Sequence, residues 1–513
     1  MKSISPAYQR YFIIIISTVF YFSFGINSIH SWSITYDEGD HYNYAIRSVK
    51  GHPEKVIPFE DGSCMPVSMI NTIPRIAEQA IHPGIVKSDG GVQDHKRGRY
   101  MTLIAGFFIL LLIYAWLSKI TTKTTAAIGF ALGSICPNII SQSSLVTTDA
   151  YAALFFLATL YFLHQWYYKG STRHFMVFSL AFACTFLVKQ SLMILIPICF
   201  VFVLARFLKT KNIKQAMLFV LLFCCINLLV LNIGFQFNYA DHLVFKSENF
   251  KLFNKNVLFN SLVVKVLPTP FLQGIDEVMY MDNLPTGDLR NLPYIFINGG
   301  FVFTKTGCPQ FFFQTLIFKT PLLFLTGWMI CLATNIKNRK WDTTFLFCVL
   351  PLAILLFFTF FVHSKVGVRH ILIIYPFIIM SAAIGFSRVK ARWYLPLVAL
   401  HIFMLFTYRN NLLAYTNEFV PDNRATVNLA GTVNVEYNQS RKIQPGVAQN
   451  NICTIDSITR VGDTLRLQVA DFFYITDSLH NKSNIFKNYT VLKIDKNNTV
   501  QVVKTTAYNK ITR

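Results

Sequence analysis

The sequence predicts an all-α polytopic membrane protein with about 11 transmembrane helices and a small β-rich C-terminal appendage. Two features of composition predict this class. Apolar residues make up 53% of the 513 residues, with 49 Phe, and only 14% of residues are charged. A cytosolic globular enzyme carries about 25% charged residues, and a disordered chain has few aromatic residues. Both classes are therefore excluded, and an integral membrane protein remains.

Apolar runs long enough to cross a hydrocarbon core of about 30 Å recur along most of the chain. They lie at residues 11–30, 100–118, 124–141, 147–164, 174–188, 190–205, 215–234, 320–335, 343–362, 368–387 and 393–408. The run at 11–30 is long and no small-x-small cleavage site follows it, so we expect a retained helix rather than a signal peptide.

The stretch 174–205 is too long for one straight span and short for two. If this stretch forms two spans and the N-terminus is cytoplasmic, the short cytoplasmic loops contain many basic residues and a single acidic residue, Asp342. The basic residues are Lys119, Lys123, Lys169, Arg173, Arg206, Lys209, Lys211, Lys214, Lys337, Arg339, Lys340, Arg388, Lys390 and Arg392. As one span, it would leave Lys189 in the bilayer at a cost of about 2.5–3.5 kcal/mol. Two short spans joined by a hairpin at Lys189 are therefore favoured.

The formal net charge of +22 is mostly explained by this orientation signal, and no nucleic-acid partner is expected. We expect a multi-pass protein of the plasma (inner) membrane with the N-terminus in the cytoplasm and the site and C-terminal domain outside. The predicted units are residues 1–30 (first transmembrane helix), 31–99 (first outer loop, with an acidic motif), 100–234 (helices 2–7), 235–319 (long outer loop), 320–408 (helices 8–11) and 409–513 (outer β-rich domain).

The C-terminal domain is predicted from a change of pattern. Thr464–Val469 and Thr490–Ile494 alternate apolar and polar residues between turn-forming residues, which is typical of strands. Three cysteines lie in polar stretches, Cys64, Cys308 and Cys453, and the sequence leaves open whether two of them form a disulfide.

Polar residues gather at the predicted outer ends of several spans. The acidic motif Asp37-Glu38-Gly39-Asp40 follows the first span, flanked by Tyr36 and His41. The others are Asp149 at the start of the fourth span, Lys189 in the hairpin, Lys319 before the eighth span, and Arg369 and His370 at the start of the tenth. The topology places all of them on one side of the membrane, near one depth.

Each of these residues also has a structural interpretation. Asp149 after Thr148 is typical of a helix N-terminus, where a carboxylate is favoured by the helix dipole. Lys319 and Arg369, taken singly, are typical of cations that extend to the membrane interface. The pair Asp37-Glu38 favours function more strongly, because two acids that close an apolar helix oppose its dipole.

Together, a carboxylate and several cations at a lipid-accessible depth suit the transfer of a group from a membrane-embedded phosphate ester. The cations would bind the phosphate and stabilise the charge that it gains on leaving. Phosphate leaves without a general acid, so one base for the acceptor hydroxyl is enough. Hydrolysis of an ordinary glycoside needs two carboxylates.

The sequence resembles the C-type membrane glycosyltransferases of the dolichyl-phosphate-mannose protein mannosyltransferase and aminoarabinose transferase kind. The resemblance covers roughly residues 10–420, and the order of the motifs makes it specific. The motifs are Tyr36-Asp37-Glu38-Gly39, Thr148-Asp149-Ala150, Lys189, Leu292-Pro293-Tyr294 through Asn298-Gly299, Gly307, Lys319-Thr320-Pro321, Gly367-Val368-Arg369-His370-Ile371 through Tyr375-Pro376, and Leu413-Ala414-Tyr415-Thr416-Asn417-Glu418.

This resemblance implies an inverting transferase that moves a sugar from a polyprenyl-phosphate donor to an acceptor on the outer face. It implies the following roles: Asp37 and Glu38 catalytic, with Asp37 as the base; Lys189, Lys319, Arg369 and His370 as ligands of the donor phosphate; Asp149, Asp40 and Tyr36 as supporting or acceptor-binding residues. No metal is expected, although Asp37, Asp40 and Asp149 would suit a divalent cation if they lay close together.

The acceptor stays open, as does the sugar. Many relatives continue after the last span with an Asp-x-Asn-x-Asp-Trp-Gly stretch, which is not found after Pro421-Asp422-Asn423-Arg424. Two alternative functions remain. A transporter or flippase of a lipid-linked saccharide would show an inverted repeat and charges at the midplane. A non-catalytic member of the same fold would have lost the chemistry, against which the intact Asp37 argues.

Overall fold

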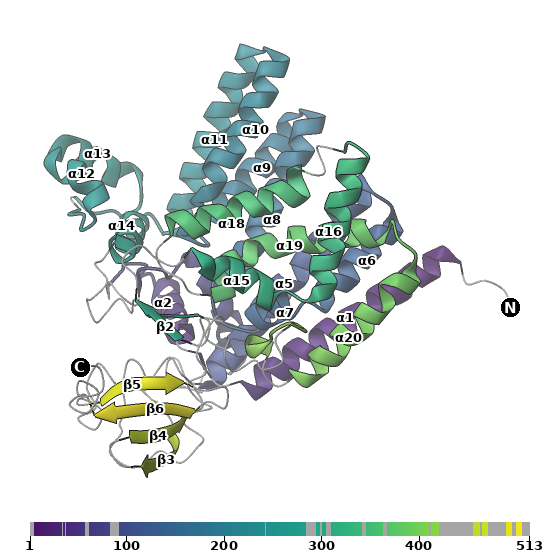
Figure 1. Cartoon of the computed structure of the whole chain (residues 1–513). Coiled ribbons are helices and arrows are strands. Elements are labelled where there is room, and N and C mark those ends of the chain that lie inside the picture. The colour runs from purple at the N-terminus through teal and green to yellow at the C-terminus, as the bar shows by residue number, and fades with distance from the viewer. Residues whose placement is uncertain are drawn as a thin grey trace.

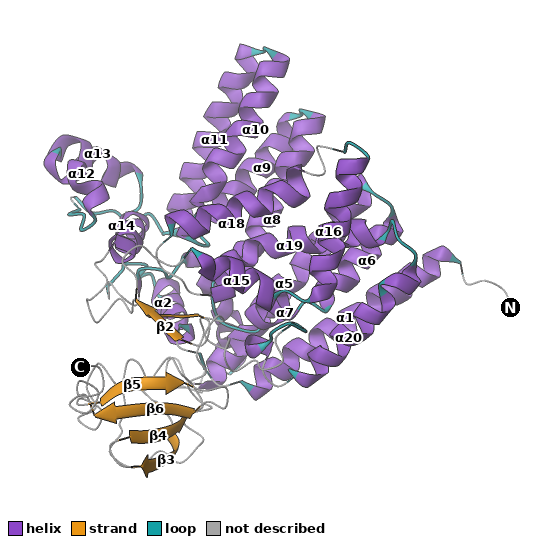
Figure 2. Ribbon diagram, in the orientation of Figure 1, coloured by secondary structure: helices purple, strands orange, loops and turns teal. Residues whose placement is uncertain are grey.

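The computed structural model describes residues 5–32, 34–35, 37–56, 61–82, 92–241, 243–283, 294–297, 300–303, 309–340, 345–362, 367–409 and 412–419, and four strands between residues 455 and 504. Most of the described chain is helical (Figure 1, Figure 2). The predictions for Tyr36, Cys308 and Cys453 fall outside the described residues. Among the cysteines that are described, Cys64 is buried.

The first half of the bundle runs from α1 to α11. Its elements are α1 (Pro6–Ser31), α2 (Glu38–Val49), η1 (Pro66–Thr72), α4 (Ile73–Ile81), α5 (Val92–Ile120), α6 (Lys123–Ser134), α7 (Pro137–Ser143), α8 (Asp149–Lys169), α9 (Thr172–Thr185), η2 (Gln190–Ile194), α10 (Leu195–Thr210) and α11 (Ile213–Gly234). The predicted hairpin appears as two helices, α9 and α10, with Lys189 between them. Figure 1 shows α9, α10 and α11 standing together at one end of the bundle.

The second half begins with a small helical group, η3 (Glu248–Phe250), α12 (Lys251–Lys255), α13 (Val257–Val266) and α14 (Thr269–Asn283). The remaining helices are α15 (Gln310–Lys319), α16 (Leu322–Lys337), the π-helix η4 (Phe345–Val349), α18 (Leu350–Phe361), η5 (Gly367–Ile374), α19 (Tyr375–Phe386), η6 (Ala391–Trp393), α20 (Leu395–Thr407) and η7 (Leu412–Ala414). Helix α20 returns alongside α1 (Figure 1), where the rings of Phe24 and Phe406 meet with centroids 5.4 Å apart.

Several helices are able to span a membrane. Within the described residues, five are long and apolar enough, and seven spans result if each of two bent helix pairs counts as one. The predicted spans at 343–362 and 393–408 correspond to shorter apolar helices, Leu346–Phe361 and Leu395–Thr407. The membrane-spanning character of the chain is thus confirmed, while the count of about 11 stays a prediction.

One bent helix pair interrupts the predicted span at 124–141, and the other bends directly before the predicted span at 320–335. The pair α6 and α7 bends by 60° and the pair α15 and α16 by 106°. Pro137 opens α7 and Pro321 precedes α16; proline has no N–H to continue a helix across these points. Lys319 therefore lies at the end of α15, at a sharp bend directly before α16, which corresponds to the predicted span at 320–335.

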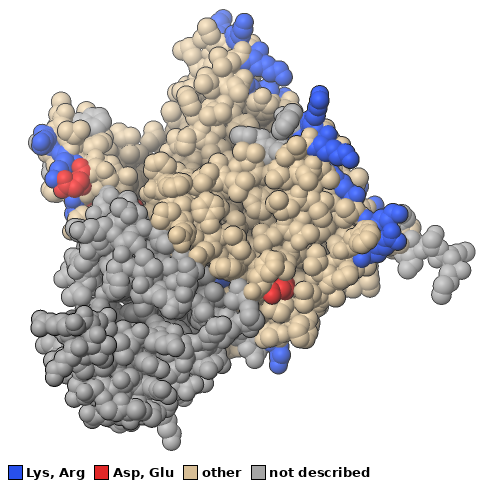
Figure 3. All heavy atoms as spheres, in the orientation of Figure 1, with Lys and Arg blue, Asp and Glu red and all other residues tan. Residues whose placement is uncertain are grey.

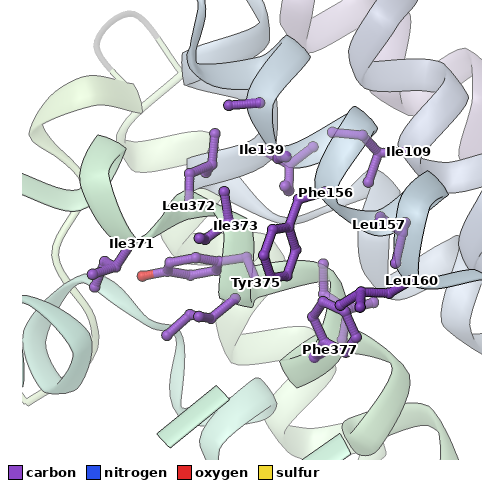
Figure 4. Close-up of a cluster of buried hydrophobic side chains, with 14 of the residues drawn as sticks. Ile109, Ile139, Phe156, Leu157, Leu160, Ile371, Leu372, Ile373, Tyr375 and Phe377 are labelled. Atoms are coloured by element: carbon purple, nitrogen blue, oxygen red, sulfur yellow. The ribbon is translucent and has the colours of Figure 1, made fainter. Parts of the chain in front are cut away.

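A buried apolar cluster fixes the helices below the site (Figure 4). Ile109 of α5, Ile139 of α7, Phe156 of α8, Ile371 of η5 and Phe377 of α19 meet there, and the rings of Phe156 and Phe377 pack edge to face at 6.0 Å. Because η5 packs on α8 in this core, the residues that precede Ile371 are held beside the start of α8.

Strands occur in two small sheets (Figure 2). The strands β1 (Tyr294–Ile297) and β2 (Gly300–Phe303) form an antiparallel hairpin. The second sheet has the order β3-β4-β6-β5, from β3 (Ile455–Val461), β4 (Thr464–Val469), β5 (Tyr489–Ile494) and β6 (Thr499–Lys504), with every neighbouring pair antiparallel. The two strand patterns predicted from sequence coincide with β4 and β5. That residues 409–513 form an outer domain remains a prediction.

The surface charges are unevenly distributed (Figure 3). In the view shown, Lys and Arg side chains lie along one rim of the bundle, and few acidic side chains are visible. Basic residues end several helices of the bundle: Lys119 in α5, Lys169 in α8, Lys209 in α10 and Lys337 in α16. That these helix ends face the cytoplasm stays a prediction.

Candidate functional site

The acidic motif begins a helix rather than ending one. Helix α1 ends at Ser31, and Asp37 is the N-cap residue of α2, with Glu38 and Asp40 in the first turn. Acidic residues at a helix N-terminus are stabilised by the dipole. The sequence argument that these acids oppose the dipole of the first span is therefore wrong. Their function has to be judged from the partners that each carboxylate has.

Glu38 is completely buried, and both oxygens of its carboxylate accept hydrogen bonds from the protein. Arg99 of α5 donates to it through Nε at 2.7 Å and Nη2 at 2.6 Å, and both side chains are 0% exposed. Three further donors are the backbone N–H of Thr35, the Thr35 hydroxyl and the backbone N–H of Val146, at 2.7, 3.0 and 2.8 Å. Burial by itself would raise the pKa of Glu38, but Arg99 and these hydrogen bonds lower it below its usual value.

The Glu38–Arg99 pair joins four parts of the chain. Arg99 also donates to the carbonyl of Trp32 at 2.9 Å, directly after α1. Through Glu38 the pair holds the start of α2, and through Val146 it holds the turn that leads to Asp149. It therefore fixes the distance between the first acidic motif and the start of α8.

Asp37 has a different environment from Glu38. Its Oδ2 accepts a hydrogen bond from Nη1 of Arg369, which lies 332 residues later on η5, and its side chain is 26% exposed. The Nε of Arg369 is buried and has no hydrogen-bond partner among the described residues. Gly367, two residues before Arg369, has a φ of +80°, a left-handed conformation that glycine adopts without strain. The structure thus brings together Asp37 and Arg369, which the sequence topology places only on one side of the membrane and near one depth.

A second ion pair lies beside the first. Lys189, in the turn between α9 and η2, donates through Nζ to Oδ1 of Asp149, the first residue of α8. Asp149 is 3% exposed at its side chain, whereas Lys189 is 18% exposed. Asp149 also interacts electrostatically with Arg369 and His370. The two pairs therefore form one network of alternating charge.

His41 lies within this network. It is one turn after Asp37 on α2, its side chain is buried, and its Nδ1 has no hydrogen-bond partner in the described part of the chain. Burial lowers the pKa of His41 to about 4. The nearby Asp37 and Asp149 raise this pKa, while Arg369 and Lys189 lower it. His41 is therefore a neutral imidazole at physiological pH.

The remaining predicted site residues that the structure describes, Lys319, His370 and Asp40, have other partners. Lys319 is 1% exposed, and its Nζ donates to the carbonyl of Leu413 at 2.9 Å. His370 packs between the rings of Phe312 and Phe358, with centroids 6.2 Å from each. Asp40 is half-buried in α2, within electrostatic reach of Cys64.

A divalent cation has no ready-made position in the described residues. No three His, Cys, Asp or Glu side chains of this part of the chain are grouped as metal ligands would be. Asp37 and Asp149 have cationic side chains as their partners instead. Residues of the charge network serve better as ligands for an anion than for a metal ion.

Two residues of the site were not predicted from the sequence, Arg99 and His41. Arg99 directly precedes the predicted second span at its outer end, and a basic residue there runs against the positive-inside pattern, which is a signal that could have identified it. His41 was visible only as a neighbour of the acidic motif. Its place beside Asp37 follows from the 3.6-residue period once residues 38–49 are recognised as a helix.

Part of the chain matches a known protein family. Residues 92–231 match the family described as dolichyl-phosphate-mannose-protein mannosyltransferase, which confirms the resemblance indicated by the motifs. The matched segment contains Arg99, Asp149 and Lys189, while Asp37 and Arg369 lie outside it. No curated protein matches the chain.

Two solved structures are similar to this chain to different degrees. The oligosaccharyltransferase AglB of Archaeoglobus fulgidus, solved with an inhibitory peptide and a dolichol-phosphate, is 14% identical, with a TM-score of 0.50 over 86% of this chain and 58% of its own. ArnT of Cupriavidus metallidurans, solved with undecaprenyl phosphate, is 13% identical, with a TM-score of 0.48 over 80% of this chain and 65% of its own. This chain thus spans less than two thirds of either protein. The similarity to AglB shows a shared fold.

Proposed function

We propose that the protein is an inverting glycosyltransferase of the membrane, which moves a sugar from a polyprenyl-phosphate donor to an acceptor hydroxyl on the outer face. The observation that carries the proposal is the charge network at the start of α2 and α8. A partly exposed carboxylate, Asp37, is paired there with a guanidinium whose Nε is buried without a partner among the described residues. A lipid phosphate would supply an acceptor for that N–H group.

The phosphate group would bind at Arg369 and Lys189. Both cations are paired with carboxylates, and a phosphate would compete for them because arginine binds phosphate oxygens in a bidentate fashion. Lys319 and His370 remain further candidate ligands, although Lys319 would have to leave the Leu413 carbonyl. Binding of the donor to Arg369 would release Asp37 from its ion pair.

The released Asp37 would act as the general base. It would take the proton of the acceptor hydroxyl as the oxygen attacks the anomeric carbon from the face opposite the phosphate. The bond between that carbon and the phosphate oxygen breaks, and its electron pair goes to the phosphate, where the cations stabilise it. The products are a glycoside of inverted configuration and polyprenyl phosphate. Asp149, Asp40 and Tyr36 are the candidates for binding the acceptor, and the chain's own residues suffice without a metal.

Glu38 has a supporting role in this proposal rather than a direct one. Its two oxygens accept five hydrogen bonds from the protein, so neither is available for a substrate proton. By joining the start of α2 to Val146, it would hold Asp37 at a fixed distance from Asp149. Glu38 is therefore a positioning residue.

The experiment compares Asp37→Asn with wild type in purified membranes. Transfer from polyprenyl-phosphate sugars should fall by about 10²–10⁴-fold, because a general base contributes on this scale. Expression and binding of undecaprenyl phosphate should be retained. If Asp37→Asn leaves transfer as fast as in wild type, Asp37 has no part in the mechanism.

The two alternative functions give other results. A transporter or flippase would move lipid-linked saccharide across vesicles containing the protein, with no new glycosidic bond. A non-catalytic member would bind undecaprenyl phosphate but transfer no sugar from any donor. Neither outcome is expected, because the site lies at the helix starts of α2 and α8 and retains its acid and both cations.

A further inference from the structure

We propose that His41 binds a hydroxyl group of the substrate and thereby positions the reacting carbon against Asp37. This inference rests on the proposed function and names a residue that the motif resemblance does not include. Three observations carry it: the placement of His41 on α2, the charges around it, and its unpartnered nitrogen.

The helix fixes His41 relative to Asp37. The backbone N–H of His41 donates to the carbonyl of Asp37 at 3.2 Å, which is the i to i+4 relation of a helical turn. Residues four apart share one helix face. The two side chains therefore move as one unit, and a group bound by His41 has a defined position relative to the Asp37 carboxylate.

The surroundings of His41 favour a neutral polar ligand. The charged groups that act on the imidazole are Asp37 and Asp149, which are acidic, and Arg369 and Lys189, which are basic. A phosphate would be bound by the two cations, which outcompete a neutral ring for a charged oxygen. A hydroxyl group, in contrast, both donates and accepts, so it fits a neutral imidazole in either tautomer.

The Nδ1 atom of His41 lacks the partner that a structural histidine usually has, and it lies among charged groups. This atom is buried and has no partner among the described residues. His401, in α20, shows the satisfied case: its Nε2 lies 2.8 Å from the carbonyl of Ile135 and its Nδ1 lies 3.4 Å from the hydroxyl of Tyr415. A buried nitrogen left without a partner beside four charged groups points to a ligand that completes the site.

The hydroxyl has two possible sources, the sugar of the donor and the acceptor. The experiment uses two variants, His41→Leu, which removes both ring nitrogens, and His41→Asn, whose amide nitrogen or oxygen can replace Nδ1. The matched control is His164→Leu. His164 also has a buried Nδ1 with no partner in the described part of the chain, but it lies on α8 near Lys119, away from the charge network.

Binding is measured by thermal shift in detergent with two kinds of probe. One is bare undecaprenyl phosphate, and the other is a panel of undecaprenyl phosphates that carry glucose, mannose or galactose. We expect a sugar-bearing lipid to bind wild type more tightly than the bare lipid. His41→Leu should weaken the binding of that sugar-bearing lipid about tenfold, which is the scale of one neutral hydrogen bond. Binding of the bare lipid should not change, and His41→Asn should stay near wild type.

Turnover separates the two sources. If His41 binds the acceptor, His41→Leu leaves the affinity for the sugar-bearing lipid unchanged. It then raises the acceptor KM about tenfold in membrane transfer assays, which is the scale of one neutral hydrogen bond. The control His164→Leu leaves the acceptor KM unchanged. If His41→Leu changes neither donor affinity nor acceptor KM, the inference is overturned while the proposed function stands. If no lipid of the panel binds wild type more tightly than bare undecaprenyl phosphate and none supports transfer, the proposed function fails, and the inference fails with it.

Discussion

Asp37 and Glu38 are adjacent carboxylates that differ in burial and in the number of hydrogen bonds they accept. Glu38 points to Arg99, is 0% exposed and has five donors around it. Asp37 points to Arg369 and is 26% exposed. Successive residues of a helix are rotated by about 100°, so the two side chains meet different neighbours. The difference teaches that a carboxylate whose hydrogen-bond acceptors are all occupied by the protein stabilises the structure, whereas a carboxylate with unoccupied acceptors is able to react.

The largest expected effect separates the two carboxylates by stability. Glu38→Gln should destabilise the protein by about 3–5 kcal/mol, because it leaves Arg99 as an uncompensated buried charge. Asp37→Asn should destabilise the protein less than Glu38→Gln does, because the side chains of the Asp37–Arg369 pair are 26% and 15% exposed, whereas those of Glu38 and Arg99 are 0% exposed. Thermal unfolding of both variants in detergent checks this, with wild type as the reference. Equal midpoints for the two variants would remove the distinction between them.

A second prediction concerns the cation that faces Asp37. Arg369→Ala should weaken binding of undecaprenyl phosphate by about 1.5–3 kcal/mol, the range for a hydrogen bond to a charged group. Titration of the purified protein with this lipid measures the change. The matched control is Arg388→Ala, on the opposite rim, where the guanidinium donates to Thr334. Unchanged affinity in Arg369→Ala would exclude Arg369 as a phosphate ligand.

The buried imidazole beside Asp37 gives a prediction for pH. The pKa of His41 is lowered to about 4 in the folded protein from 6.5, so between these values the unfolded chain binds the extra proton. Stability should therefore fall as the pH decreases through this window, by about 2 kcal/mol at pH 5 relative to neutral pH.

The measurement is the thermal midpoint at pH 7 and pH 5. The variant His41→Asn cannot titrate there and should lose less stability than wild type over the same interval. A variant that is as acid-sensitive as wild type would assign the loss to other groups.

The smallest effect is expected from metal removal. Treatment with EDTA should leave transfer unchanged, because Asp37 and Asp149 already have Arg369 and Lys189 as partners. A loss of activity that Mg²⁺ or Mn²⁺ restores would show that the acids share a cation during turnover, and would reverse the assignment of the network to an anion.

Much of this protein follows from its sequence alone. The apolar runs determine that the chain is helical and membrane-spanning, because unpaired backbone groups are too costly in lipid. The topology places Asp37, Asp149, Lys189 and Arg369 on one side of the membrane, but the pairing of Asp37 with Arg369 and of Asp149 with Lys189 comes from the structure. Hydropathy could not locate the bend between α6 and α7, because both segments of this pair are apolar and form one continuous apolar run.

The role of each carboxylate was decided only by the tertiary structure. The sequence presents Asp37 and Glu38 as one acidic pair, and nothing local distinguishes them. Their partners lie 332 and 61 residues away, and packing of η5 on α8 and of α5 on α2 brings them in. The same packing left the Nδ1 of His41 without a partner among the described residues. Charge and hydrophobic periodicity are local properties that can be read from a sequence. Whether a buried polar group has hydrogen-bond partners depends on every element packed around it.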